Sequence, residues 1–147
     1  MTKRKVYIIG SLRNPEVPLI AARLRELMPN VEVFDDWYAA GERADDHWRD
    51  YEKARGHTFQ EALEGYAANH VFEFDKYHLD TSDAAILVLP AGKSGHLELG
   101  YVAGRGKWTA ILLDDDPERF DVMYLFADMV TNKVDDILDG LKEEWGL

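Results

Sequence analysis

The sequence predicts an α/β protein in which parallel strands form one sheet and helices cover both of its faces. Short apolar segments alternate along the chain with segments of helical period, which is the pattern of strand–helix–strand units. The apolar segments lack a polar–apolar alternation, so both faces of each strand are expected to be buried. The 147 residues suffice for one hydrophobic core, and we expect a single domain over residues 1–147.

The first part of the chain is predicted to hold a strand, a helix and a second strand. Residues 6–9 are all apolar and end at Gly10, as expected of a buried strand. In residues 15–28 the apolar positions recur at the spacing of one helix face. We predict the second strand over residues 31–34, directly before an acidic and aromatic cluster.

The middle of the chain carries no clear strand between residues 35 and 83. Residues 43–55 are highly charged. Thr58 and Glu61 have the spacing of a capping box, in which a hydroxyl and a carboxylate bind the first free amides of a helix. Aromatic and apolar residues then recur at helical spacing, so we predict one helix from residue 58 to about residue 79.

The last part of the chain repeats the alternation of strands and helices. Residues 84–89 form the most apolar strand, and a turn of small residues leads from it into a helix over residues 96–105. Two further strands are predicted over residues 109–113 and 129–131, with helices over residues 121–127 and 134–145. This order is typical of a flavodoxin-like three-layer fold with a parallel sheet of about five strands.

Composition excludes several classes of function. The 17 Lys and Arg against 28 Asp and Glu give a net charge of −11, which disfavours binding to a nucleic acid polymer or to an anionic membrane. No apolar run approaches the ~20 residues of a membrane span, and the run after the basic start is too short for a signal peptide. The chain has no cysteine, which excludes disulfides and thiolate nucleophiles. We expect a cytoplasmic enzyme for small molecules, or an acidic interaction module.

Ligands of such folds bind where the carboxyl ends of the strands meet. One candidate segment there is the glycine-containing turn that includes Ser94, Gly95 and His96 and leads into a helix. Glu98 is expected in the first turn of that helix, where the helix dipole favours its ionised form. An ionised carboxylate at this edge can act as a nucleophile or stabilise a developing cation. The alternative is that Glu98 only complements the helix dipole.

Asp75 is a second candidate, on the helix that leads toward strand 84–89. Its neighbours in sequence are aromatic, so its helix face is partly apolar. A buried carboxylate there would hold a proton to a higher pH and could transfer it. The alternative is an exposed acid on an amphipathic helix.

Two further strand ends carry groups that suit a ligand. Gly10, Ser11 and Arg13 combine a turn, a hydroxyl and a guanidinium that could bind a phosphate or a sugar hydroxyl, or could form an ordinary turn. Asp36 and Trp37 could bind and stack a nucleobase, or could be a capping acid beside a core aromatic pair. No dinucleotide motif, P-loop or metal-ligand spacing is present, so we expect no cofactor and no metal.

Together these segments resemble the nucleoside 2-deoxyribosyltransferase family, including its relatives that hydrolyse 2′-deoxynucleoside 5′-monophosphates. The resemblance covers essentially the whole chain and is strongest over residues 75–106. There, an Asp stands eight residues before Asp83 at the start of a strand, and a glycine turn leads into the motif Glu-Leu-Gly-Tyr at residues 98–101. The resemblance implies that Glu98 is the nucleophile and that Asp75 is the acid of the site.

The resemblance further implies nucleosides and free nucleobases as ligands, a role in nucleoside salvage, and a homo-oligomer whose subunits share an active site. In this family a neighbouring subunit lends a segment similar to the one that contains Asp121 and Met123. Asp121 would repel a 5′-phosphate and favours a free nucleoside, whereas Ser11 and Arg13 are more like the phosphate loop of the hydrolases. Gly92 stands where the transferases carry an Asp and the hydrolases a Ser, and it supports neither.

The sequence therefore leaves three hypotheses about function. The leading one is a transferase that exchanges the base of a 2′-deoxyribonucleoside through a covalent intermediate on Glu98. The second is an N-glycosidase that releases the free base and deoxyribose 5-phosphate from 2′-deoxynucleoside 5′-monophosphates. The third, of a different class, is a flavodoxin-like or TIR-like nucleotide-binding module without turnover.

Overall fold

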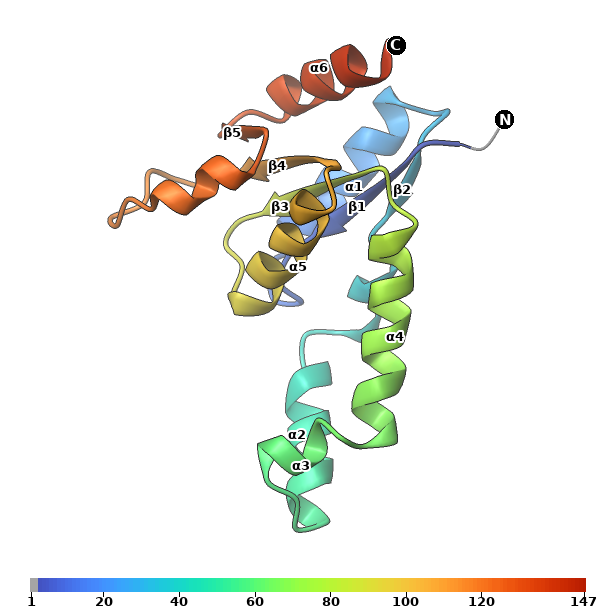
Figure 1. The fold of residues 1–147 in the computed structure, drawn as a ribbon, viewed down its shortest axis with the longest axis vertical. Coiled ribbons are helices and arrows are strands. Elements are labelled where there is room, and N and C mark those ends of the chain that lie inside the picture. The colour runs from blue at the N-terminus through green and yellow to red at the C-terminus, as the bar shows by residue number, and fades with distance from the viewer. Residues whose placement is uncertain (1–2) are drawn as a thin grey trace.

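The computed structural model describes residues 3–147 and shows in them a parallel sheet of five strands between two layers of helices (Figure 1). The strand order is β2-β1-β3-β4-β5, and every neighbouring pair is parallel. This confirms the predicted fold class, a flavodoxin-like three-layer α/β fold. The strands are β1 (Lys5–Ile9), β2 (Glu32–Phe34), β3 (Ala84–Val88), β4 (Trp108–Leu112) and β5 (Met129–Thr131).

The helices divide between the two faces of the sheet and a projecting arm (Figure 1). Helices α1 and α6 cover one face, whereas α4 and α5 cover the other. Two short 3-10 helices, η1 and η2, follow β2 and precede β5. The helices are α1 (Glu16–Leu27), α2 (Ala44–Ala54), α3 (Phe59–Ala62), α4 (Tyr66–Asp80), α5 (Lys93–Gly104) and α6 (Val134–Trp145), with η1 (Asp36–Ala40) and η2 (Val122–Phe126).

Alternating side chains of the strands enter two separate apolar layers, as the pleat of a strand requires. In β1, Val6 and Ile8 pack toward α1 and α6, whereas Tyr7 and Ile9 pack toward α4 and α5. All four side chains are almost completely buried, and Tyr7 is only 1% exposed. The strand parity therefore places the Tyr7 hydroxyl on the same side of the sheet as the two helices that carry Asp75 and Glu98.

The single helix predicted over residues 58–79 is wrong, because the structure has two helices there. The capping box of Thr58 and Glu61 is present and begins α3, but this helix ends after one turn. Gly65 has an extended backbone and becomes the N-cap of α4. A Cβ at Gly65 would lie 3.3 Å from the Ala62 carbonyl oxygen, so the tight turn between the two helices favours glycine.

Two other predicted helices differ in their limits or type. Helix α5 begins at Lys93, three residues before the predicted start at His96, because the small residues of the turn already adopt helical backbone. The helix predicted over residues 121–127 is the 3-10 helix η2, which Asp121 caps through its side chain. The strand predicted over residues 129–131 is confirmed as β5.

An arm formed by α2, α3 and the N-terminal half of α4 projects away from the sheet (Figure 1). Its small interior includes Ala62 and the carboxylate of Glu52, which is 3% exposed and pairs with His57 Nδ1 at 2.6 Å. Much of the aromatic surface of α4 remains open, and Tyr66 is 97% exposed. Over residues 3–147 no helix has the length and apolarity needed to cross a bilayer.

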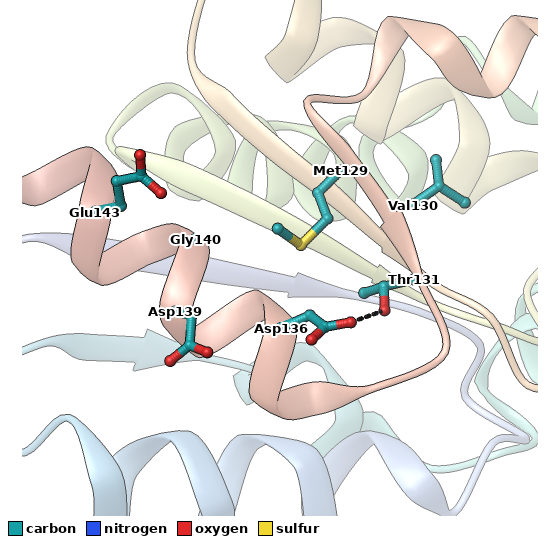
Figure 2. A pocket seen from close by; sticks show the side chains of 7 residues that line it. All are labelled: Met129, Val130, Thr131, Asp136, Asp139, Gly140 and Glu143. Atoms are coloured by element: carbon teal, nitrogen blue, oxygen red, sulfur yellow. Dashed lines mark hydrogen bonds between the residues drawn. The ribbon is translucent and has the colours of Figure 1, made fainter.

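At the edge of the sheet, α6 packs closely on β4 and β5 through a glycine. Figure 2 shows Met129 of β5 directed toward Gly140 of α6, beside the acidic residues Asp136 and Asp139. A Cβ at Gly140 would lie 2.8 Å from Trp108 Cζ2 and 2.9 Å from Met129 Cε. Gly140 therefore permits a helix-to-strand distance that any larger residue would increase.

We expect Gly140→Ala to destabilise the protein although alanine is the better helix former. The methyl group would overpack the interface, and the loss should exceed the ~1 kcal/mol gained in helix propensity, for a net loss of about 1 kcal/mol. Gly100→Ala in α5 is the matched control, because a Cβ at Gly100 meets no atom within 4 Å. Urea unfolding should show opposite signs for the two substitutions. A stabilised Gly140→Ala protein would contradict the packing argument.

Candidate functional site

Glu98 and Asp75 lie near each other on the face of the sheet toward which Tyr7 points. Glu98 comes from α5, Asp75 from α4 and Tyr7 from β1, so three elements distant in sequence contribute to one cluster. The charge of Asp75 acts on Glu98, and the Tyr7 hydroxyl is hydrogen bonded to the Glu98 carboxyl group. The structure thus brings together the two acids that the sequence singled out.

Gly95 explains why α5 can approach the sheet closely enough to form this cluster. It is buried in the first turn of α5, and a Cβ there would lie 3.0 Å from Leu87 Cδ1 and 3.2 Å from Ile9 Cγ2. The helix therefore rests directly on the ends of β1 and β3. Gly95 acts as a spacer within the fold, and Glu98 lies one helical turn further along on the side that faces Tyr7.

Burial dominates the electrostatics of Glu98. It raises the pKa of the Glu98 carboxyl group to about 7, with a smaller contribution from the negative charge of Asp75. The hydrogen bond from Tyr7 opposes this shift, because it stabilises the ionised form. The prediction that the helix dipole keeps Glu98 ionised is wrong for two reasons: Glu98 lies in the second turn of α5, and desolvation outweighs the dipole.

Asp75 and Tyr7 are shifted by the same cause. Burial raises the pKa of Asp75 to about 6, so this carboxyl group is not the exposed acid of an ordinary amphipathic helix. Burial and the neighbouring carboxylates raise the pKa of Tyr7 above its ordinary value. Tyr7 therefore keeps its proton and remains a hydrogen-bond donor near neutral pH.

The turn after β1 is ordered by its own contacts. Gly10 packs between α1 and Trp37, and a Cβ there would lie 2.7 Å from Val17 Cγ2. The hydroxyl of Ser11 accepts a hydrogen bond from the backbone N–H of Arg13. The Arg13 guanidinium lies 3.7 Å from the Asp46 carboxylate of α2. Its charge is thus already partly balanced, which lessens its suitability for a phosphate.

The aromatic pair after β2 has a structural role. Trp37 Nε1 donates to the backbone oxygen of Ile8 at 2.7 Å, and its ring packs against both apolar layers. Trp37 and Tyr38 form an edge-to-face pair with ring centroids 5.7 Å apart. This is the core aromatic pair that was the alternative to base stacking. Asp36 is exposed beside it.

His96 connects the beginning of α5 to η2. Its Nδ1 donates to the carbonyl oxygen of Gly92 at 2.8 Å, and its Nε2 lies 2.9 Å from the Tyr124 hydroxyl. Asp121 caps η2 by accepting from the N–H of Met123, so its carboxylate has a structural function. Both Met123 and Ser94 are exposed. The structure thereby brings η2 next to the turn that precedes Glu98.

Sequence reasoning missed Tyr7, Tyr101 and Tyr124 as polar partners of the site. The available signal for Tyr7 was a hydroxyl group inside an otherwise aliphatic buried strand. Such a group requires a hydrogen-bond partner, and this predicts a polar cluster on one face of the sheet.

Two surface pockets lie away from the acid cluster. One, of about 330 Å³, lies between β5 and α6 (Figure 2), and the other, of about 440 Å³, lies between α1 and the start of α6. In the part of the chain that the structure describes, no three His, Asp or Glu side chains converge in a way that could hold a metal ion. The chemistry that the geometry supports is carboxylate chemistry at Glu98 and Asp75. No family model and no curated protein matches the chain.

The raised pKa of Glu98 should make the free energy of unfolding depend on pH. An acid whose pKa is higher in the folded state binds its proton more tightly there, so its contribution to stability falls as the pH rises from about 4.5 to 7. We expect Glu98→Gln to raise the free energy of unfolding by about 2 kcal/mol at pH 8.5 and to change it little at pH 4.5. Glu73→Gln, on the exposed surface of α4, is the control. Equal effects of Glu98→Gln at both pH values would contradict the burial of the charge.

Proposed function

We propose that this protein is a nucleoside 2-deoxyribosyltransferase, which exchanges the base of a 2′-deoxyribonucleoside through a covalent deoxyribosyl–Glu98 intermediate. The observation that carries the proposal is the pair of partly buried carboxyl groups, Glu98 and Asp75, with the Tyr7 hydroxyl directed at Glu98. Carboxyl groups with raised pKa values in a common environment are typical of acid–base and nucleophilic sites. The sequence resemblance described above assigns the same two residues.

The protonation state of the pair suits this reaction near neutral pH. Because the pKa of Asp75 is about 6 and that of Glu98 about 7, the two groups together hold roughly one proton between these values. Because Glu98 has the higher pKa, this proton lies mainly on Glu98 in the free protein, so it passes to Asp75 before Glu98 attacks. Glu98 is then the carboxylate that attacks, and Asp75 holds the proton that leaves with the base. Breaking an N-glycosidic bond requires both, as in glycosidases that use two carboxyl groups.

Base exchange proceeds by two successive displacements at C1′. A Glu98 oxygen attacks C1′ as the C1′–N bond breaks, and the departing base takes its proton from Asp75. The nitrogen of a second base then attacks C1′, the ester to Glu98 breaks, and the proton lost by the second base returns to Asp75. The negative charge of Glu98 stabilises the cationic character of the sugar in both transition states. Two displacements at C1′ retain its configuration.

Tyr7 is assigned to hold the Glu98 carboxylate. It donates to Glu98 and cannot lose its own proton, since burial raises its pKa. A hydrogen bond to one carboxylate oxygen stabilises the ionised nucleophile and leaves the other oxygen to face the sugar. Glu98 therefore retains a defined orientation in spite of the flexibility of its side chain.

A free nucleoside is favoured over a nucleoside 5′-monophosphate. Arg13, the cationic residue of the turn after β1, already lies beside Asp46. A phosphate dianion would have to compete with that carboxylate for the guanidinium. The net charge of −11 further disfavours a doubly charged ligand. Hydrolysis of monophosphates is therefore an outcome to be distinguished by experiment.

We further propose that the protein is a homo-oligomer in which η2 contacts a second copy near the acid site. Segment 120–126 is strongly apolar, yet Phe120 is 86% exposed and Leu125 84% exposed. Such a patch on a small domain indicates an interaction surface. The His96–Tyr124 contact holds this patch next to the beginning of α5. A second copy that covers it would thus also border the site of Glu98.

Base exchange tests the proposed function directly. Incubation with deoxyinosine and adenine should yield deoxyadenosine and hypoxanthine, which chromatography resolves. Glu98→Ala should lower the rate at least about 1,000-fold, because it removes the nucleophile. Glu73→Ala on the exposed face of α4 should retain full activity. If the wild-type protein exchanges no purine or pyrimidine pair, the transferase proposal is wrong, and release of deoxyribose 5-phosphate from monophosphates would establish the hydrolase instead.

Leu125→Asp tests the oligomer. A charge in the centre of the apolar segment should dissociate the oligomer and reduce base exchange, because burying an unpaired carboxylate in an interface is unfavourable. Leu19→Asp, at a position of α1 that is 61% exposed, should leave both properties unchanged. Sedimentation equilibrium measures the mass and the exchange assay measures activity. A monomeric wild-type protein would rule out a site shared between subunits.

A further inference from the structure

The C-terminal ends of α4 and α5 meet at a polar cluster around Asp80. The Tyr101 hydroxyl of α5 donates to Asp80 Oδ1 at 2.5 Å, and Lys76 Nζ donates to Asp80 Oδ2 at 2.7 Å. The guanidinium of Arg105, which follows α5, lies 3.8 Å from the same carboxylate. Hydrogen bonds that involve a charged group are the stronger ones, so Asp80 is a firm attachment point between the two helices.

The two helices that carry the acids diverge from this cluster. They lie close at their C-terminal ends and separate toward their N-terminal ends, where α4 continues into the arm (Figure 1). Glu98 precedes Tyr101 by three residues, and Asp75 precedes Asp80 by five. Each acid is therefore about one turn of helix away from the Tyr101–Asp80 bond. The separation of the acids depends on the angle that the helices make there.

Other contacts hold the end of α4 without joining it to the body of α5. Lys107 Nζ donates to the backbone oxygen of Asp80 at 2.6 Å, and Lys5 Nζ donates to His78 Nδ1 at 2.7 Å. Lys107 thus satisfies carbonyl groups at the C-terminal end of the helix, and Lys5 attaches this end to β1. Loss of the Tyr101 hydroxyl would leave them in place. The Tyr101–Asp80 bond is thus the shortest of the side-chain links between α5 and α4, which also include the contacts of Tyr101 with Lys76 and of Arg105 with Asp80.

We propose that Tyr101 and Asp80 are positioning residues, which fix the separation between Glu98 and Asp75 by joining α5 to α4. This inference rests on the proposed function for its catalytic meaning, whereas its structural part can be tested without substrate. Because bond making at C1′ tolerates little displacement, a small rotation of α4 is enough to separate the attacking carboxylate from the proton donor.

The test compares Tyr101→Phe, Asp80→Ala and the double variant, with Tyr77→Phe on α4 as the matched control. Tyr77 is 61% exposed, and its replacement also removes one hydroxyl from the same helix pair. The carboxyl carbon of Glu98 is followed by NMR during a pH titration of the free protein. In both single variants we expect its midpoint to fall toward the ordinary range of glutamate, because separation from Asp75 and added water favour the ionised form.

Base exchange gives the second readout. Tyr101→Phe and Asp80→Ala should each lower kcat by about tenfold with little change in KM. The kcat of the double variant should be no lower than that of the less active single variant, because both substitutions break the same hydrogen bond. Tyr77→Phe should match the wild type in both measurements. An unchanged Glu98 midpoint in folded Tyr101→Phe and Asp80→Ala would overturn the positioning role.

The two proposals fail in different ways. If the wild-type protein exchanges no bases, the proposed function fails. The NMR midpoints then still decide whether the Tyr101–Asp80 bond controls the separation of the two acids. If exchange occurs and neither variant alters the Glu98 midpoint or kcat, only the positioning role of Tyr101 and Asp80 is wrong. Should Asp80→Ala unfold, Tyr101→Phe alone decides, because it removes a single hydroxyl from a half-buried ring.

Discussion

Two carboxyl groups are held largely out of water between α4, α5 and β1, and the rest of the structure has to offset the cost of that burial. The raised pKa values of Glu98 and Asp75 measure this cost, since each reflects a charge that water would have stabilised. The compensation comes from the two apolar layers, in which nearly every residue of β1, β3 and β4 is buried. A small domain with a less complete core could not keep such a pair at this position.

The route from sequence to acid pair depends on a few local constraints. The parity of β1 directs Tyr7 toward α4 and α5, and Gly95 permits α5 to rest on the sheet. The side chain of Glu98 then bonds to Tyr7, and the Tyr101–Asp80 hydrogen bond joins α5 to the end of α4. Each constraint is ordinary by itself. Their common result is a charge environment that neither helix would produce alone.

The sequence was sufficient to predict the sheet and to single out two acids that lie near each other in the structure, but it did not predict much of what surrounds them. Continuous apolar runs predicted the three central strands β1, β3 and β4, because strands buried on both faces need such runs. The short edge strands β2 and β5 were predicted from their place in the alternation of strands and helices. The break at Gly65 was missed because apolar periodicity continues across it. Helix propensity and pattern likewise did not reveal that α5 begins at Lys93. The packing of Trp37 and the ionisation of Glu98 depend on tertiary burial, which local patterns do not contain.

The arm has a consequence for how this fold can diversify. It is inserted between β2 and the C-terminal half of α4, and it projects away from the sheet (Figure 1). Insertions, deletions or changes of surface within residues 41–65 would leave β1, α5 and the end of α4 intact. The surface of the arm and the packing around the two acids are thereby encoded in separate segments of the chain.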